Sequence, residues 1–166
     1  MAKRPNLTTE HSGQDADQLS KLFKSRAEKS LAESIELLSA RGLYATALNK
    51  IEQGQDISDE LPELKTISTA NAVRIINNLI ADADERVESA WALDTRYADL
   101  FKTSFRMKQP PGELFPVFDV EYTAMTNDGT VVISAVSNRR MVTVTVTGSD
   151  AAIQSLAKQL VIAGLG

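Results

Sequence analysis

The sequence has no cysteine and a single histidine, His11, among its 166 residues. Without cysteine, disulfides, thiolate metal sites and a cysteine nucleophile are excluded. Because His11 lies in a polar N-terminal stretch, a histidine-based metal site or a Ser-His-Asp triad is not expected. We therefore expect neither a metal nor another cofactor.

Long hydrophobic runs are also missing. No apolar stretch approaches the roughly 18 residues that a membrane-spanning helix needs. The first residues, Met-Ala-Lys-Arg-Pro-Asn, lack the apolar core of a signal peptide. We expect a cytoplasmic protein that does not contact a membrane.

The common motifs of catalytic sites are absent as well. No phosphate-binding loop, dinucleotide-binding glycine motif or nucleophile elbow occurs. Asp84 and Glu88 lie on one predicted helix face and can hold a hard cation weakly, but they fit the solvent face of that helix better. We expect a non-enzymatic protein without a small-molecule substrate.

Neither proline nor glycine interrupts residues 68–105, and this stretch carries a seven-residue apolar repeat. Such spacing predicts one long helix, or two helices joined end to end, with an apolar stripe that needs a partner. The partner is either the N-terminal helices or another copy of the chain. Six residues of this stripe are the predicted oligomer interface: Val73, Ile76, Ile80, Val87, Tyr97 and Phe101.

Asp94 falls where the repeat expects an apolar side chain. Because a buried, unpaired carboxylate is costly, the helix is expected to bend, or to end and restart, near this residue. The alternative is a polar layer that sets the register of an oligomer, with Asp94 paired to Arg96 or to a neighbouring chain.

The N-terminal part predicts a disordered arm over residues 1–14, followed by two helices. The first helix begins near Asp15 or Asp17 and is stopped or bent by Gly42; the second continues from Leu43 and ends at Gly54. These two helices form a predicted helical hairpin, and the connection that follows is expected to join the core through Leu61, Leu64 and Ile67. Together with the long helix they make up a helical domain over residues 15–109.

After residue 112 the apolar period changes from helical to two. Residues 118–124, 130–136 and 141–147 predict three strands, separated by the turns Asn127-Asp128-Gly129 and Ser137-Asn138-Arg139-Arg140. A helix follows, capped near Ser149. The predicted fold class is α+β, with a C-terminal three-stranded antiparallel meander and helix over residues 113–166. Its threonine-rich face is exposed in this prediction and suited to a partner strand or sheet.

Charge is unevenly spread along the chain. Residues 51–100 hold four Lys/Arg and eleven Asp/Glu, whereas residues 1–50 hold eight and six. Since phosphate contacts need cations, nucleic acid is expected to meet only the N-terminal part. The candidate nucleic-acid contacts are Lys3, Arg4, Lys21, Lys24, Arg26 and Lys29.

Two functions follow from this pattern. The first is a non-enzymatic scaffold or adaptor that forms a homo-oligomer and binds protein partners. The second is a nucleic-acid-binding adaptor. The order of the predicted parts, together with Leu48-Asn49-Lys50-Ile51-Glu52-Gln53-Gly54 before a helix from Ser68, resembles the small DNA-packaging subunits of tailed phages. That resemblance implies an oligomeric DNA-associated protein and assigns no residue roles.

Overall fold

The computed structural model describes residues 3–108, 116–139 and 141–162, with side chains from Asp15 onward. Its contacts divide the chain into two units. One is contiguous and covers Ser30–Ala90; the other combines Met1–Lys29 with Trp91–Gly166. We call them the helical unit and the sheet unit. The first helix, α1 (Lys3–Glu52), contributes its C-terminal half to the former and its N-terminal half to the latter.

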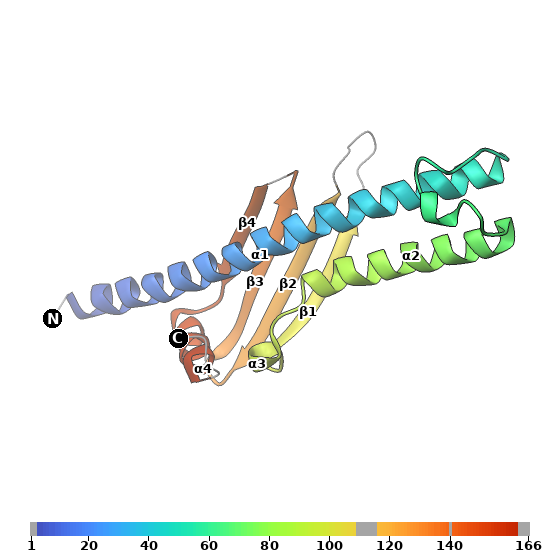
Figure 1. Cartoon of the computed structure of the whole chain (residues 1–166). Helices are drawn as coiled ribbons and strands as arrows, with labels where there is room; N and C mark the ends of the chain where they lie inside the picture. The colour runs from blue at the N-terminus through green and yellow to red at the C-terminus, as the bar shows by residue number, and fades with distance from the viewer. Residues whose placement is uncertain (1–2, 109–115, 140, 163–166) are drawn as a thin grey trace. The chain divides into compact units, whose positions relative to one another are not determined.

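The helical unit pairs the C-terminal half of α1 with α2 (Thr69–Ala90), and the two helices lie side by side (Figure 1). Gly54 ends α1 with a φ of 73°, where the Gln55 N–H donates to the Lys50 carbonyl at 2.8 Å. A left-handed glycine with this backbone bond is a common helix C-terminus. Ser68 begins α2, since its Oγ accepts the Asn71 N–H at 3.4 Å.

The connection between these helices folds back onto them. It contains a short 3₁₀ turn, η1 (Pro62–Leu64), and it buries Ile57, Leu61 and Leu64 against Ala47, Ala72 and Ile76. An ion pair between Lys50 and Glu60 holds the loop to the end of α1. This confirms that apolar residues of the connection join the core, as Leu61, Leu64 and Ile67 predicted.

The sheet unit contains a four-stranded antiparallel sheet in the order β1-β2-β3-β4. Its strands are β1 (Phe101–Lys108), β2 (Val117–Thr126), β3 (Gly129–Asn138) and β4 (Met141–Thr147). Thr126 pairs with Gly129, and Asn138 with Met141, so β2–β3 and β3–β4 are tight hairpins. The described residues therefore form a meander with β1 and β4 at its edges.

One face of this sheet is covered by the N-terminal half of α1 and by the C-terminal helix α4 (Asp150–Ile162) (Figure 1). Phe23 of α1 packs on Phe101 and Tyr122, with ring centroids 5.7 and 5.4 Å apart. The buried face of α4 carries Ala152, Ile153, Leu156 and Leu160. Burying this much apolar side chain is the main stabilisation that the unit has available. Ser149 caps α4 by accepting the Ala152 N–H at 3.1 Å.

The prediction of a mixed helix-and-sheet fold is confirmed, but the predicted number of strands is wrong. The described residues form four strands, because residues 101–108 form β1 instead of ending the long helix. The three predicted strands and both predicted turns are present. Phe101 and Phe105 are the two half-buried residues of β1 and lie on one face of the strand, which pairs with β2.

The predicted long helix over residues 68–105 is wrong. Helix α2 ends at Ala90, and a single turn, α3 (Thr95–Ala98), follows with Asp94 at its N-cap position. The expectation that the helix ends and restarts near Asp94 is confirmed. Asp94 is solvent-accessible, so the cost of burying its carboxylate is avoided.

The N-terminal part also differs from expectation. Helix α1 begins at Lys3, within the predicted arm of residues 1–14, and it passes through Gly42 without a break. Pro5 lies in the first turn, where a missing N–H costs little. The helical hairpin is therefore formed by α1 and α2 instead of two N-terminal helices. The division into units likewise differs from the predicted boundaries 1–14, 15–109 and 113–166.

The two helix-associated glycines predict opposite mutational effects. A Cβ at Gly42 meets no atom within 4 Å, so Gly42→Ala should raise the free energy of unfolding by about 0.5–1 kcal/mol. Gly54→Ala, the matched control, should lower it, because φ is 73° there. Urea denaturation of both variants tests this. A Gly42→Ala variant that is less stable than wild type would show that α1 is not continuous at Gly42.

Candidate functional site

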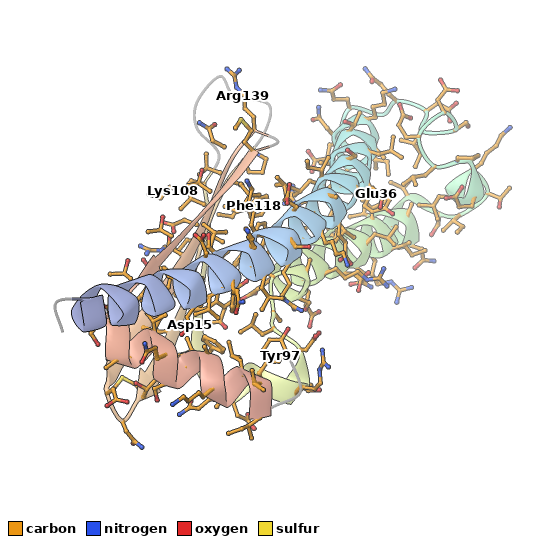
Figure 2. The ribbon with its side chains drawn as sticks, turned by 90° about the vertical axis from the view of Figure 1, so that its left-hand side faces the viewer. Asp15, Glu36, Tyr97, Lys108, Phe118 and Arg139 are labelled. Atoms are coloured by element: carbon orange, nitrogen blue, oxygen red, sulfur yellow. The ribbon has the colours of Figure 1, made fainter. Side chains whose placement is uncertain are left out.

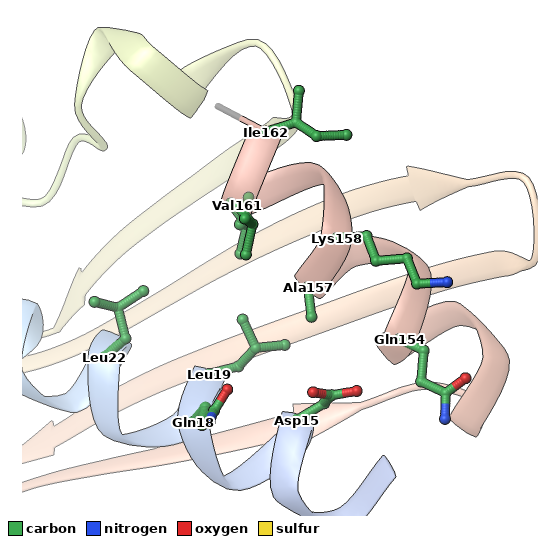
Figure 3. A pocket seen from close by; sticks show the side chains of 10 residues that line it. Asp15, Gln18, Leu19, Leu22, Gln154, Ala157, Lys158, Val161 and Ile162 are labelled. Carbon is green, nitrogen blue, oxygen red and sulfur yellow. The ribbon is translucent and has the colours of Figure 1, made fainter. Parts of the chain in front are cut away.

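An apolar groove lies between α1 and α4 in the sheet unit (Figure 3). Its volume is about 800 Å³. Leu19 and Leu22 line it from α1, and Ala157, Leu160, Val161 and Ile162 line it from α4. Asp15 and Gln18 on one wall, and Gln154 and Lys158 on the other, supply its polar groups. The groove therefore has an apolar lining and opposite charges on its two walls.

The last residues of α4 leave apolar side chains in solvent. Val161 is 62% and Ile162 85% exposed, whereas Leu160 is 1% exposed. Single exposed apolar residues are common on protein surfaces, whereas an exposed apolar pair beside a groove forms a contiguous patch that can bind a partner. This part of the sheet unit is suited to bind an apolar surface.

A polar cluster joins α1 to the start of the sheet unit's second segment. Arg26 Nη1 lies 3.2 Å from Asp94 Oδ2 and donates to Tyr97 Oη at 3.1 Å, while Nη2 donates to the Ala92 carbonyl at 2.8 Å. Arg26 and Arg96 also lie over the Tyr97 ring, each with Cζ 5.8 Å from its centroid. Arg26 is therefore committed to internal contacts.

Nearby, the Tyr122 hydroxyl donates to the Trp91 carbonyl at 2.5 Å. Burial raises the pKa of Tyr122 to about 12, so the hydroxyl keeps its proton over the physiological range. Arg26 also lowers the pKa of Asp94 below its ordinary value, chiefly through its charge. Both shifts belong to contacts that hold the fold together.

The structure separates the six residues of the predicted oligomer interface. Ile76 and Val87 are buried within the helical unit, at 0% and 2% exposure, and Val73 and Ile80 are half-buried in the same unit. Tyr97 and Phe101 belong to the sheet unit, where they contact Arg26 and Phe23. A single chain thus already covers much of this stripe.

The exposed side of α1, which was predicted to contact nucleic acid, carries less net positive charge than its three lysines alone would give. Lys21, Lys24 and Lys29 are exposed on α1, but the exposed Asp17 and Glu28 are interleaved with them. Arg26 is half-buried and paired with Asp94, and the side chains of Lys3 and Arg4 lie outside the described residues. The exposed face of α1 between Asp17 and Lys29 therefore carries a net charge of only +1.

A second group of cations lies on the sheet and was not singled out from the sequence. Lys102, Arg106 and Lys108 alternate along the outward face of β1. Arg139, at the β3–β4 turn, lies at the same end of the sheet as Lys108 (Figure 2). Asp119 lies opposite Arg106, with their charged groups 4.0 Å apart. In Lys-Thr-Ser-Phe-Arg-Met-Lys the cations fall on one face only if the segment is a strand, whereas the sequence pattern predicts a helix here.

Within residues 15–108, 116–139 and 141–162, no three His, Cys, Asp or Glu side chains gather as a metal site requires. Over the described part of the chain, no helix has the length and apolar character needed to cross a bilayer. Comparison with known proteins gives no match to a family model, to a curated protein or to a solved structure. The candidate site therefore depends on the chain's own geometry.

The Arg26–Asp94 contact predicts a specific pH dependence. Because the pKa of Asp94 is lowered from 3.8, the contact stabilises the fold above pH 3.8, and this stabilisation is lost as pH falls through the folded-state pKa. Arg26→Met should destabilise the protein at pH 7 and make its stability less sensitive to acid. Urea midpoints at pH 7 and between pH 5 and 2 measure both effects.

Lys29→Met is the matched control, since Lys29 is an exposed cation one turn further along α1. It should keep the acid dependence of wild type. If Arg26→Met and Lys29→Met lose stability in parallel with wild type below pH 4, the charge of Arg26 does not control the titration of Asp94.

Proposed function

We propose that this chain is a non-enzymatic structural or adaptor protein that assembles with further copies of itself. The observation that carries this proposal is the apolar groove between α1 and α4, with Val161 and Ile162 exposed beside it. Removing such apolar surface from water favours association by roughly 25 cal/mol per Å² before the cost of association is subtracted.

A second copy is the occupant that the charges of the groove favour. Asp15 lies on the α1 wall and Lys158 on the α4 wall. A two-fold contact brings the same surface of both copies together, so each wall can meet the oppositely charged wall of its partner. A single chain already buries Ile76 and Val87 of the apolar stripe on residues 68–105. The groove, in contrast, is open to a second copy.

The net charge of the two units also favours contacts through the sheet unit. The helical unit carries five Lys/Arg and eleven Asp/Glu, a net charge of −6. The sheet unit carries thirteen and eleven, a net charge of +2. Like charge repels, so two helical units are poor partners for each other and two sheet units are better ones.

Light scattering on a sizing column tests the proposal. The wild-type chain should have a mass of at least twice 18.1 kDa. Val161→Glu combined with Ile162→Glu should lower the mass toward one chain, because both side chains are exposed and the fold does not need them. Ala151→Glu, an exposed change on the same helix, should keep the wild-type mass.

Two outcomes would overturn this proposal. At a chain concentration of about 100 µM, only complexes with a Kd in the millimolar range or weaker stay dissociated. If the wild-type chain is monomeric at this concentration, self-assembly is not its function. A multimer whose mass is unchanged in the Val161→Glu/Ile162→Glu variant removes the groove as its contact surface.

The cations of β1 favour a second candidate, a nucleic-acid-binding adaptor of the kind that the phage packaging subunits represent. Lys102, Arg106 and Lys108 form a row on one edge of the sheet, and Arg139, at the β3–β4 turn, lies at the same end of the sheet as Lys108. Phosphate groups require such rows of cations, and binding weakens steeply with salt. No aromatic side chain accompanies this row on the outward face of β1, so any contact would be to phosphate and independent of sequence.

Binding of a DNA fragment to the protein at low salt, measured as retention of the DNA by the immobilised chain, tests this candidate. Lys102→Glu, Arg106→Glu and Lys108→Glu together should abolish retention, whereas the same change at Lys21, Lys24 and Lys29 should weaken it less, because Asp17 and Glu28 already offset those lysines. If the wild-type chain retains no DNA at about 50 mM salt, this candidate is withdrawn. Equal loss in the two triple variants would show that β1 is not the main contact.

A further inference from the structure

The two edges of the sheet differ in the feature that decides whether an edge strand pairs with another chain. The β1 edge carries Lys102, Arg106 and Lys108 at alternate positions. The β4 strand, Met-Val-Thr-Val-Thr-Val-Thr, has no charged residue and no proline. Charged side chains, lysine above all, and proline are the usual means of protecting an edge from pairing. By this criterion β1 is protected and β4 is open.

The hairpin geometry shows which backbone groups β4 offers. Asn138 pairs with Met141 across the two-residue turn, and paired residues that exchange hydrogen bonds alternate along an antiparallel ladder. Met141, Thr143 and Thr145 thus bond to β3. The N–H and C=O groups of Val142, Val144 and Val146 point to the open edge. They match the hydrogen-bonding pattern of an added strand.

The side chains of β4 also favour an added strand. Thr143, Thr145 and Thr147 are exposed on the outward face of the sheet. Val144 and Val146 lie on the face that α1 and α4 cover, but they are only half-buried because β4 is at the edge. A strand placed beside β4 would cover these two valines and place its own β-branched residues next to the threonines.

We propose that the β4 edge pairs antiparallel with β4 of a second copy, which joins the two sheets into one of eight strands. Around a two-fold axis at Val144, Val142 of one copy lies opposite Val146 of the other, and Thr143 lies opposite Thr145. Valines thus meet valines and threonines meet threonines from Val142 to Val146, and Met141 lies opposite Thr147. This inference rests on the proposed self-assembly and assigns to it a second two-fold contact, separate from the groove between α1 and α4.

Charge complementarity selects this partner and this direction. In the antiparallel arrangement, the turn before one β4 lies beside the segment that follows the other. Arg139 is exposed in that turn, and Asp150 is exposed at the start of α4. The two-fold axis therefore brings Arg139 of each copy close to Asp150 of its partner. A parallel arrangement would place the two Arg139 side chains together, and a β1–β1 contact would oppose three cations on each side.

Single-cysteine crosslinking tests the contact, and the absence of native cysteine makes every crosslink assignable. In the Val144→Cys variant the two new thiols face each other across the axis. Directly opposite residues of a hydrogen-bonded pair have Cα atoms about 5.5 Å apart, within the range of a disulfide. Oxidation should give a covalent dimer on a non-reducing gel. Thr103→Cys, at the middle of β1 and on the same face of the sheet, is the matched control and should remain monomeric.

A charge-reversal cycle supplies a second readout. Arg139→Asp and Asp150→Arg should each weaken self-association roughly five- to tenfold, since two symmetric ion pairs are lost and replaced by repulsion. The double variant should recover most of the loss. Aspartate is chosen at position 139 because φ is 58° there, a conformation that Asp tolerates better than most residues. Circular dichroism of each variant checks that the fold is intact.

The outcomes separate this inference from the proposed function. If the wild-type chain is monomeric by light scattering, self-assembly itself fails. If it is multimeric but the Val144→Cys variant forms no disulfide and the double variant does not recover, copies meet through another surface and β4 is not the contact. Equal crosslinking of the Val144→Cys and Thr103→Cys variants would indicate random collision and would also overturn the assignment.

Discussion

The sheet unit depends on how the chain passes from α2 into the sheet. The segment between Ala90 and Phe101 leaves a helix and must place β1 in register with β2. Three interactions hold this segment: the Tyr122 hydroxyl donates to the Trp91 carbonyl in the interior, and Arg26 donates to the Ala92 carbonyl and pairs with the Asp94 carboxylate. Backbone carbonyls just past the end of a helix have no donor within that helix, so they need donors from elsewhere when water is excluded. Both donors come from elements distant in sequence, so the connection is ordered only in the folded unit.

The parts of the fold that follow from local patterns could be predicted from the sequence. Alternating apolar and polar residues in β2 and β4, and a dense apolar run in β3, were enough to place these strands, because Asn-Asp-Gly and Asn-Arg-Arg mark the turns between them. The first strand was missed because Tyr97 and Phe101 are four residues apart, which also fits a helix. Residues 101–108 become a strand because β2 offers them a hydrogen-bonding edge, and this is a tertiary effect that overrides local preference. Similarly, Gly42 costs α1 about 1 kcal/mol, less than packing along the helix provides.

The candidate site was less accessible to sequence reasoning. The helix that follows Ser149 was predicted, but the difference between buried Leu160 and exposed Val161 depends on the tertiary packing of that helix. The groove brings together residues from opposite ends of the chain, and no local pattern links Leu22 to Ile162. Arg26 shows the same limit: its position among lysines suggested a solvent-exposed cation, whereas Asp94 and Tyr97 hold it inside the unit.

The discontinuity of the sheet unit has a consequence for biosynthesis. Its first segment, Met1–Lys29, leaves the ribosome well before Trp91–Gly166, while the helical unit between them is complete at Ala90. The helical unit relies on contacts that are close in sequence, so it can fold while the rest of the chain is still being made. The side chains of Phe23 and Leu19, by contrast, stay exposed to solvent until the strands that cover them have been synthesised. The nascent chain therefore carries an unprotected amphipathic helix during much of translation, and this interval is when a chaperone has the most surface to bind.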